Sequence, residues 1–119
     1  MRGTVIVESL EGAILPPLLG SAKTFHIPAP SATAEQPEVW TFATFDLPDG
    51  DAESVAEELS ARLKPGPWYA NFSTAAMVFV VFRHRAFGYA VGDVAGRADA
   101  QTYALAQGVP QNQIDWTEK

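Results

Sequence analysis

The stretch from residue 67 to residue 93 constrains the fold most, because it holds three apolar runs joined by very short links. The runs read PWYANFS, AAMVFVVF and RHRAFGYAVGD. The middle run has apolar side chains at both sets of alternating positions and no charge, which is typical of a strand covered on both faces. Links this short cannot hold crossover helices, so the strands must be antiparallel. We therefore expect a three-stranded meander whose middle strand lies at the centre of a sheet.

Other segments predict further strands before this stretch. TVIVESL (residues 4–10) has the β-branched content of a strand. In residues 39–47 both sets of alternating side chains are mostly apolar, which predicts a second strand. KTFHI predicts a short edge strand that ends at Pro28. Residues 28–37, PAPSATAEQP, are small, polar and rich in proline. They predict an exposed, mobile loop in the position of a lid.

Two helices are predicted from apolar spacing and capping residues. Asp51 is the expected cap of a helix over residues 52–64, whose apolar positions recur every three or four residues. Asp93 is the expected cap of a second helix that runs to residue 107, after which Gly108 takes the left-handed conformation. We expect residues 109–119 to pack back on the domain, because Trp116 is costly to leave in water.

The predicted fold is a single α+β domain over residues 1–119. It would consist of an antiparallel sheet of four or five strands with two helices packed mainly on one face. The uncovered face would then expose apolar side chains, and self-association is the simplest way to cover them. We therefore expect a homodimer that forms through the sheet.

Composition narrows the classes of partner. The formal net charge is −6 and the pI about 4.7, which disfavours nucleic acid as a partner. No apolar run approaches the roughly 18 residues of a membrane span, so no membrane partner is expected. The absence of cysteine excludes disulfides and thiolate chemistry, and it is consistent with the cytoplasmic location that we expect.

Four segments resemble a group of small hypothetical proteins from actinobacteria: GPWYANF, FVVFRHRAFGYAVGD, AGRADA and GVPQNQIDW. That group has a GxWYxxF strand, a VVFxGxVFxY hairpin and a GVPxxQLDW tail. The resemblance covers roughly residues 39 to 116 and implies no function, because none is known for the group. This chain has His84 where the hairpin of the group has glycine. Histidine tolerates positive φ better than most residues, so we expect His84 to be a left-handed turn residue rather than a catalytic one.

Residues with catalytic chemistry are few. His26 and His84 are the two histidines, and no HxH, HxxxH or HExxH spacing is present, so we expect neither a metal site nor a cofactor. Ser73, His26 and Asp46 could form a triad on paper, but no nucleophile elbow supports it. His26 and Asp46 remain the catalytic candidates, with His26 or a nearby carboxylate as a general base.

The aromatic residues offer the main functional alternative to a plain core. If the small side chains at positions 86, 88 and 90 leave their face uncovered, a pocket could form beside Trp68 or Tyr69. The ligand-binding candidates are Trp40, Trp68, Tyr69, Tyr89 and Arg97. The ordinary alternative for Arg97 is an ion pair with Asp93 one helical turn away.

These observations rank two classes of function. The first is a non-catalytic binding or protein-interaction domain, homodimeric through its sheet, whose partner is a protein or an apolar small molecule. The alternative is a small cofactor-independent enzyme that uses His26 or a nearby carboxylate as its base. A structural or particle component, which would also assemble through its sheet, has the same sequence features.

Overall fold

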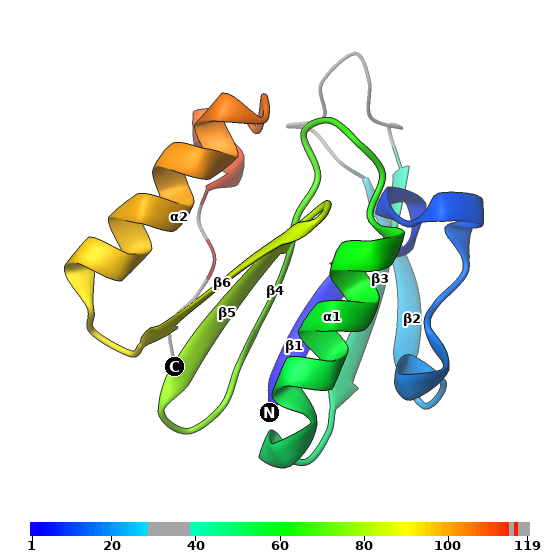
Figure 1. The fold of residues 1–119 in the computed structure, drawn as a ribbon. Coiled ribbons are helices and arrows are strands. Elements are labelled where there is room, and N and C mark those ends of the chain that lie inside the picture. The colour runs from blue at the N-terminus through cyan, green and yellow to red at the C-terminus, as the bar shows by residue number, and fades with distance from the viewer. Residues whose placement is uncertain (29–38, 115, 117–119) are drawn as a thin grey trace.

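The computed structural model describes residues 1–28, 39–114 and 116, and residues 29–38, 115 and 117–119 lie outside the described part of the chain. One antiparallel sheet and two α-helices make up an α+β domain (Figure 1). The loop expected at residues 28–37 lies outside the described residues, apart from Pro28.

The sheet has six strands, in the order β2-β3-β1-β4-β5-β6. In chain order the elements are β1 (Arg2–Ile6), β2 (Lys23–Pro28), β3 (Val39–Asp46), α1 (Ala52–Arg62), β4 (Ala70–Ser73), β5 (Met77–Phe82), β6 (Arg85–Ala90) and α2 (Val94–Ala106). Short 3-10 turns connect β1 to β2: η1 (Val7–Ser9), η2 (Glu11–Ala13) and η3 (Pro17–Leu19). The prediction of four or five strands is wrong, because the edge strand β2 pairs with β3 along its whole length.

Strand β1 lies in the middle of the sheet, between β3 and β4. Gly3 makes this possible, since a Cβ there would lie 2.3 Å from the Cβ of Phe72 and 2.5 Å from the tip of the Phe45 ring. The two rings close over the strand where a side chain would otherwise stand. The strand ends at Ile6 rather than at Leu10, because the chain turns into η1 and Leu10 forms an isolated bridge with Leu63.

The meander predicted for the second half of the chain is confirmed. Strand β5 pairs with β4 on one side and with β6 on the other, both antiparallel. His84 in the β5–β6 turn has a φ of 59°, which confirms its predicted left-handed conformation.

Helix α1 packs its apolar stripe against one face of the sheet. Val55, Ala56 and Leu59 are buried in a cluster that includes Val81 of β5. Asp51 occupies the predicted N-cap position, but its side chain does not make the capping hydrogen bond that the sequence suggested. A 3-10 turn (η4, Asp49–Asp51) precedes the helix, and its Asp49 carboxylate binds the N-terminal ammonium at 2.5 Å.

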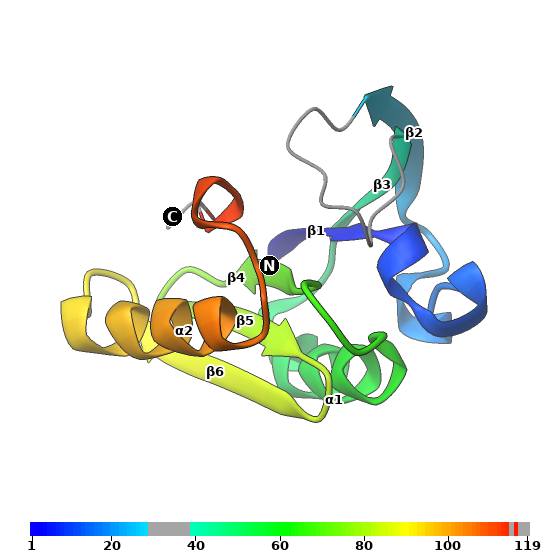
Figure 2. The ribbon, with the colours of Figure 1, turned by 90° about the horizontal axis from the view of Figure 1, so that it is seen from above.

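Helix α2 packs against the opposite face. Phe82 and Tyr89 are buried with Ala100 and Ala104 of this helix. Successive residues of a strand point to opposite faces, so Val81 faces α1 while Phe82 faces α2. Figure 2 shows the two helices on opposite sides of the sheet. The expectation that both helices cover mainly one face is therefore wrong, and the reason is that β5 is apolar on both faces and needs cover on each.

Both ends of α2 follow the sequence prediction. The Asp93 carboxylate accepts a hydrogen bond from the Gly96 N–H at 3.1 Å. Gly108 has a φ of 91°, as expected of a glycine that ends a helix.

Gly96 lets α2 lie close to β6, and a substitution there tests this packing. A Cβ at position 96 would lie 2.6 Å from the Cβ of Tyr89. In an exposed helix Gly→Ala stabilises by about 1 kcal/mol, but we expect Gly96→Ala to lower the free energy of unfolding by about 1–3 kcal/mol through overpacking. Urea unfolding measures the change. The control is Gly50→Ala, where nothing lies within 4 Å of an added Cβ. A Gly96→Ala protein as stable as wild type would contradict the close contact.

Candidate functional site

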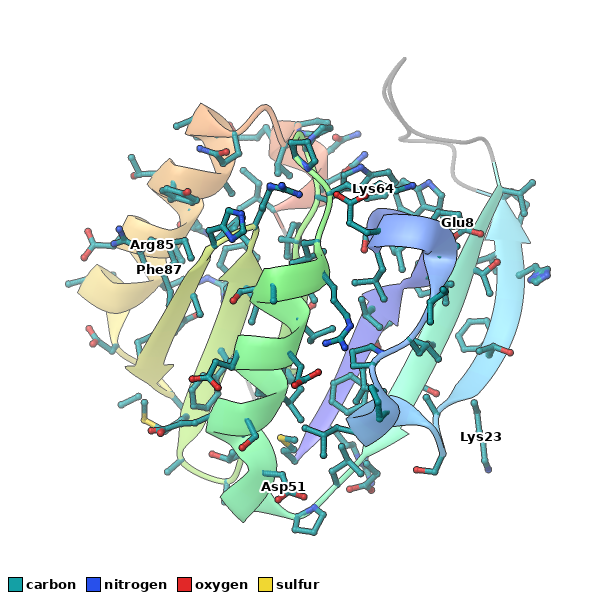
Figure 3. The ribbon with its side chains drawn as sticks, turned by 45° about the vertical axis from the view of Figure 1, so that its right-hand side comes forward. Glu8, Lys23, Asp51, Lys64, Arg85 and Phe87 are labelled. Carbon is teal, nitrogen blue, oxygen red and sulfur yellow. The ribbon has the colours of Figure 1, made fainter. Side chains whose placement is uncertain are left out.

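Strand β2 is an exposed edge of the sheet. All six of its residues are exposed, and among the residues that the structure describes its one neighbour in the sheet is β3. Phe25 is 45% and Ile27 37% exposed. They share one face of the strand with Lys23, because alternate residues point the same way. Figure 3 shows Lys23 at the outer edge of β2, pointing away from the sheet.

Two aromatic residues of β3 lie behind these side chains. Phe25 is opposite Phe42 and Ile27 is opposite Trp40 in the β2–β3 register. The Phe25 and Phe42 rings stack with their centroids 5.7 Å apart, and the Phe42 and Trp40 rings with theirs 6.1 Å apart. We call Phe25, Ile27, Trp40 and Phe42 the β2 patch.

Trp40 contributes apolar area to this patch rather than a hydrogen bond. It is 8% exposed, and its buried Nε1–H has no acceptor among the residues that the structure describes. Leaving such a donor unpaired costs about 1–3 kcal/mol. Its ring centroid is 6.1 Å from that of Trp68, so the patch is continuous with the interior.

An open cleft borders Trp68. It has a volume of about 580 Å³ and is lined by Glu11, residues 64–68, Gln107 and Gly108. That volume falls in the range of small-molecule sites. Glu11 is already engaged, because the Arg83 guanidinium donates a hydrogen bond to its carboxylate at 3.0 Å. Lys64 and Gln107 carry the other long polar side chains of the lining.

The other three ligand-binding candidates contact the chain's own C-terminal segment. The Trp116 indole N–H donates a hydrogen bond to the Tyr89 hydroxyl at 2.8 Å, and Arg97 donates one to the Trp116 carbonyl at 3.0 Å. The Arg97 guanidinium also lies 5.2 Å from the centroid of the Trp116 ring. The Tyr69 hydroxyl donates to the Gln113 carbonyl, and its ring meets Trp116 edge-on at 5.4 Å. The structure thus brings Trp40 and Trp68 together, whereas Tyr69, Tyr89 and Arg97 contact Gln113 or Trp116 of the C-terminal segment.

The general-base candidate His26 lies on the opposite face of β2 from Phe25, next to Thr41 and Glu8. Thr41 donates two hydrogen bonds to the Glu8 carboxylate, from its backbone N–H at 2.7 Å and from its hydroxyl at 2.6 Å. The His26 Nδ1 is 3.5 Å from the same hydroxyl. Burial acts to raise the pKa of Glu8, but the hydrogen bonds from Thr41, aided by the charge of His26, hold this pKa below its usual value. A carboxylate with a lowered pKa is a weaker base, so the geometry suits an anchor between η1 and β3.

Asp46 is not part of this group. It lies at the far end of β3, five residues from Thr41, which corresponds to about 17 Å along a strand. Its carboxylate meets the Arg2 guanidinium at 3.6 Å, and Ser73 lies opposite Arg2 in the β1–β4 register. The structure therefore places Ser73 and Asp46 near one another but separates both from His26, and no Ser-His-Asp triad is assembled.

The residues that sequence reasoning missed are Phe25 and Ile27. The edge strand itself was predicted, and the alternation in KTFHIP already places both apolar side chains on one face. What the sequence left open was whether another element covers that face.

The described residues contain neither a cluster of metal ligands nor a helix of membrane-spanning character. Within residues 1–28, 39–114 and 116, no three potential ligands from histidine, aspartate and glutamate gather closely enough to hold a metal ion. No helix in the same part of the chain has the length and apolar character needed to cross a bilayer.

Comparison with protein-family models, with curated proteins and with solved structures finds no match to this chain. The resemblance to the actinobacterial group stays a prediction.

The anchoring role of Glu8 predicts a specific pH dependence. Because the pKa of Glu8 is lowered in the folded state, the hydrogen bonds from Thr41 stabilise the fold above the unfolded pKa of about 4.3, and this stabilisation is lost as pH falls through the lower folded pKa. Thr41→Val removes one of the two bonds. We expect it to lower the free energy of unfolding by about 1 kcal/mol at pH 7, and by less at pH 3.

Chemical denaturation at both pH values measures this difference. The matched control is Thr44→Val on the same strand, whose hydroxyl donates only to the Lys23 carbonyl, at 3.4 Å. Its effect should not change with pH. An equal loss at both pH values for Thr41→Val would contradict the role of the Glu8 carboxylate.

Proposed function

We propose that this chain is a non-catalytic protein-interaction domain that self-associates through the β2 end of its sheet. The observation that carries the proposal is the β2 patch, where Phe25 and Ile27 stand exposed on an edge strand in front of Trp40 and Phe42. Edge strands are normally short, charged or covered by another element, because a long exposed apolar edge invites pairing with another chain. Fully burying a Phe or Ile side chain is worth about 1.5–3 kcal/mol, and roughly half of that is still available at each position.

The charge of β2 supports the same proposal. The chain carries a formal net charge of −6, which opposes self-association in general. Strand β2, however, contains Lys23 and His26 and no carboxylate. Two copies that meet at this edge bring few acidic groups together.

In this proposal the cleft beside Trp68 is the place for an apolar small molecule. The Trp68 indole forms part of the wall of the cleft, and the Lys64 side chain can contact a polar group of the ligand. The cleft is a secondary site, since half of its lining residues are proline or glycine and supply few functional groups for a ligand.

The alternative function is a small cofactor-independent enzyme with His26 as its base. The contact between His26 and the Thr41 hydroxyl favours it. Two observations place it second. The residues that line the cleft do not include His26, and the carboxylate in the group, Glu8, has both oxygens bonded to Thr41.

Sedimentation equilibrium at tens of micromolar tests the proposal. We expect the wild-type chain to be a dimer. Phe25→Lys, which removes apolar area and adds a charge beside Lys23, should weaken the dimer by at least about tenfold, or about 1.4 kcal/mol.

The matched control is Val94→Lys. Val94 is 80% exposed but begins α2, which packs on β6 at the opposite edge of the sheet from β2. This variant should dimerise like wild type. A monomeric wild-type chain would remove the proposal, as would a Phe25→Lys variant that remains a dimer.

A further inference from the structure

We infer that the partner at β2 is a second copy of this chain, added antiparallel so that the two β2 strands pair around a two-fold axis at Phe25. The result is one continuous sheet, with six strands from each protomer. This inference rests on the proposed self-association and goes beyond it by naming the strand pairing and its register.

Pairing of β2 with itself closes the assembly. An antiparallel pair of identical edge strands is isologous, so both edges are used up and growth stops at the dimer. Pairing of β2 with the other edge, β6, would be head-to-tail and would continue into a filament. Strand β6 also exposes Arg85, Ala86, Gly88 and Ala90 rather than large apolar side chains, so it offers less area to cover.

The apolar faces restrict the register. Residues directly opposite each other in an antiparallel pair point to the same face. When the two-fold axis passes through a residue, Phe25 and Ile27 of both protomers lie on the same face of the joined sheet. When the axis passes between two residues, they lie on opposite faces. In such a dimer the two β2 patches form one aromatic surface, with the Phe42 and Phe25 rings of both chains side by side.

Two registers satisfy this condition and also pair five of the six residues of β2. An axis at Phe25 places Thr24 opposite His26 of the partner subunit. It also places Lys23 opposite the apolar Ile27 of the partner subunit. An axis at His26 places two imidazoles face to face and puts Pro28, which has no N–H to donate, opposite Thr24. We therefore assign the axis to Phe25.

The small size of the contact determines the concentration at which the dimer forms. One six-residue strand with two half-exposed apolar side chains lies at the low end of specific interfaces. We therefore expect a weak dimer that becomes visible only at high protein concentration.

Disulfide trapping tests the register, because the chain has no cysteine of its own. Thr24→Cys and His26→Cys both lie on the face of β2 away from Phe25, so the patch stays intact. In the proposed register these two positions are opposite each other, with Cα atoms about 5.5 Å apart, within disulfide range. One variant carries a size tag, the two are mixed in equal amounts, and mild oxidation is followed by non-reducing electrophoresis.

We expect a crosslinked band of mixed size that forms at least about tenfold faster than crosslinking of Val94→Cys, which reports random collision. Addition of Phe25→Lys to both cysteine variants should abolish the band. Unfolding midpoints equal to wild type show that each variant is folded.

The remaining outcomes separate the inference from the proposed function. If His26→Cys alone crosslinks as fast as the mixture, the axis at Phe25 is wrong. If the wild type sediments as a dimer but the mixture crosslinks no faster than Val94→Cys, strand pairing is wrong while self-association through the patch stands. If the wild type sediments as a monomer, the strand pairing and the proposed self-association are both wrong.

Discussion

Two short helices have to cover the two faces of a six-stranded sheet, and they cannot cover all of it. Neighbouring strands lie about 4.8 Å apart, so the outer strands of six are about 24 Å apart. A helix with its side chains is about 10 Å wide and covers roughly two strands. Helix α1 lies on one face and α2 on the other, both toward the β4–β6 half. The edge strand β2 is what remains beyond their reach.

The C-terminal segment around Trp116 covers further apolar surface on the α2 face of the sheet. Trp116 buries its ring beside Tyr69 and satisfies its indole N–H on Tyr89, while its carbonyl is held by Arg97. Every polar atom named here has a partner within the chain. The β2 patch differs, because Phe25 and Ile27 are exposed there and no other strand within residues 1–28, 39–114 and 116 pairs with the outer side of β2.

In the group of Glu8, Thr41 and His26, the hydrogen bonds stabilise the charged form of the carboxylate and make it a weaker base. The Glu8 carboxylate is held by two hydrogen bonds from Thr41, and the same contacts lower its pKa. They fix η1 on β3 and keep the charge in place. A base would need free lone pairs and a pKa close to the working pH, and the bonds from Thr41 work against both.

The sequence by itself determined the local structure where patterns were strong: the meander, both helices, the caps at Asp93 and Gly108, and the turn at His84. Each of these depends on alternation, spacing or backbone preference over a few residues. It also placed Phe25 and Ile27 on one face of an edge strand. Only the tertiary structure decided which helix covers which face, that β1 lies in the middle of six strands, and that the tail occupies Tyr69, Tyr89 and Arg97. The physical reason is that coverage depends on contacts between segments far apart in the chain, such as Trp116 with Tyr89 and Gly3 with Phe72, which no local pattern records.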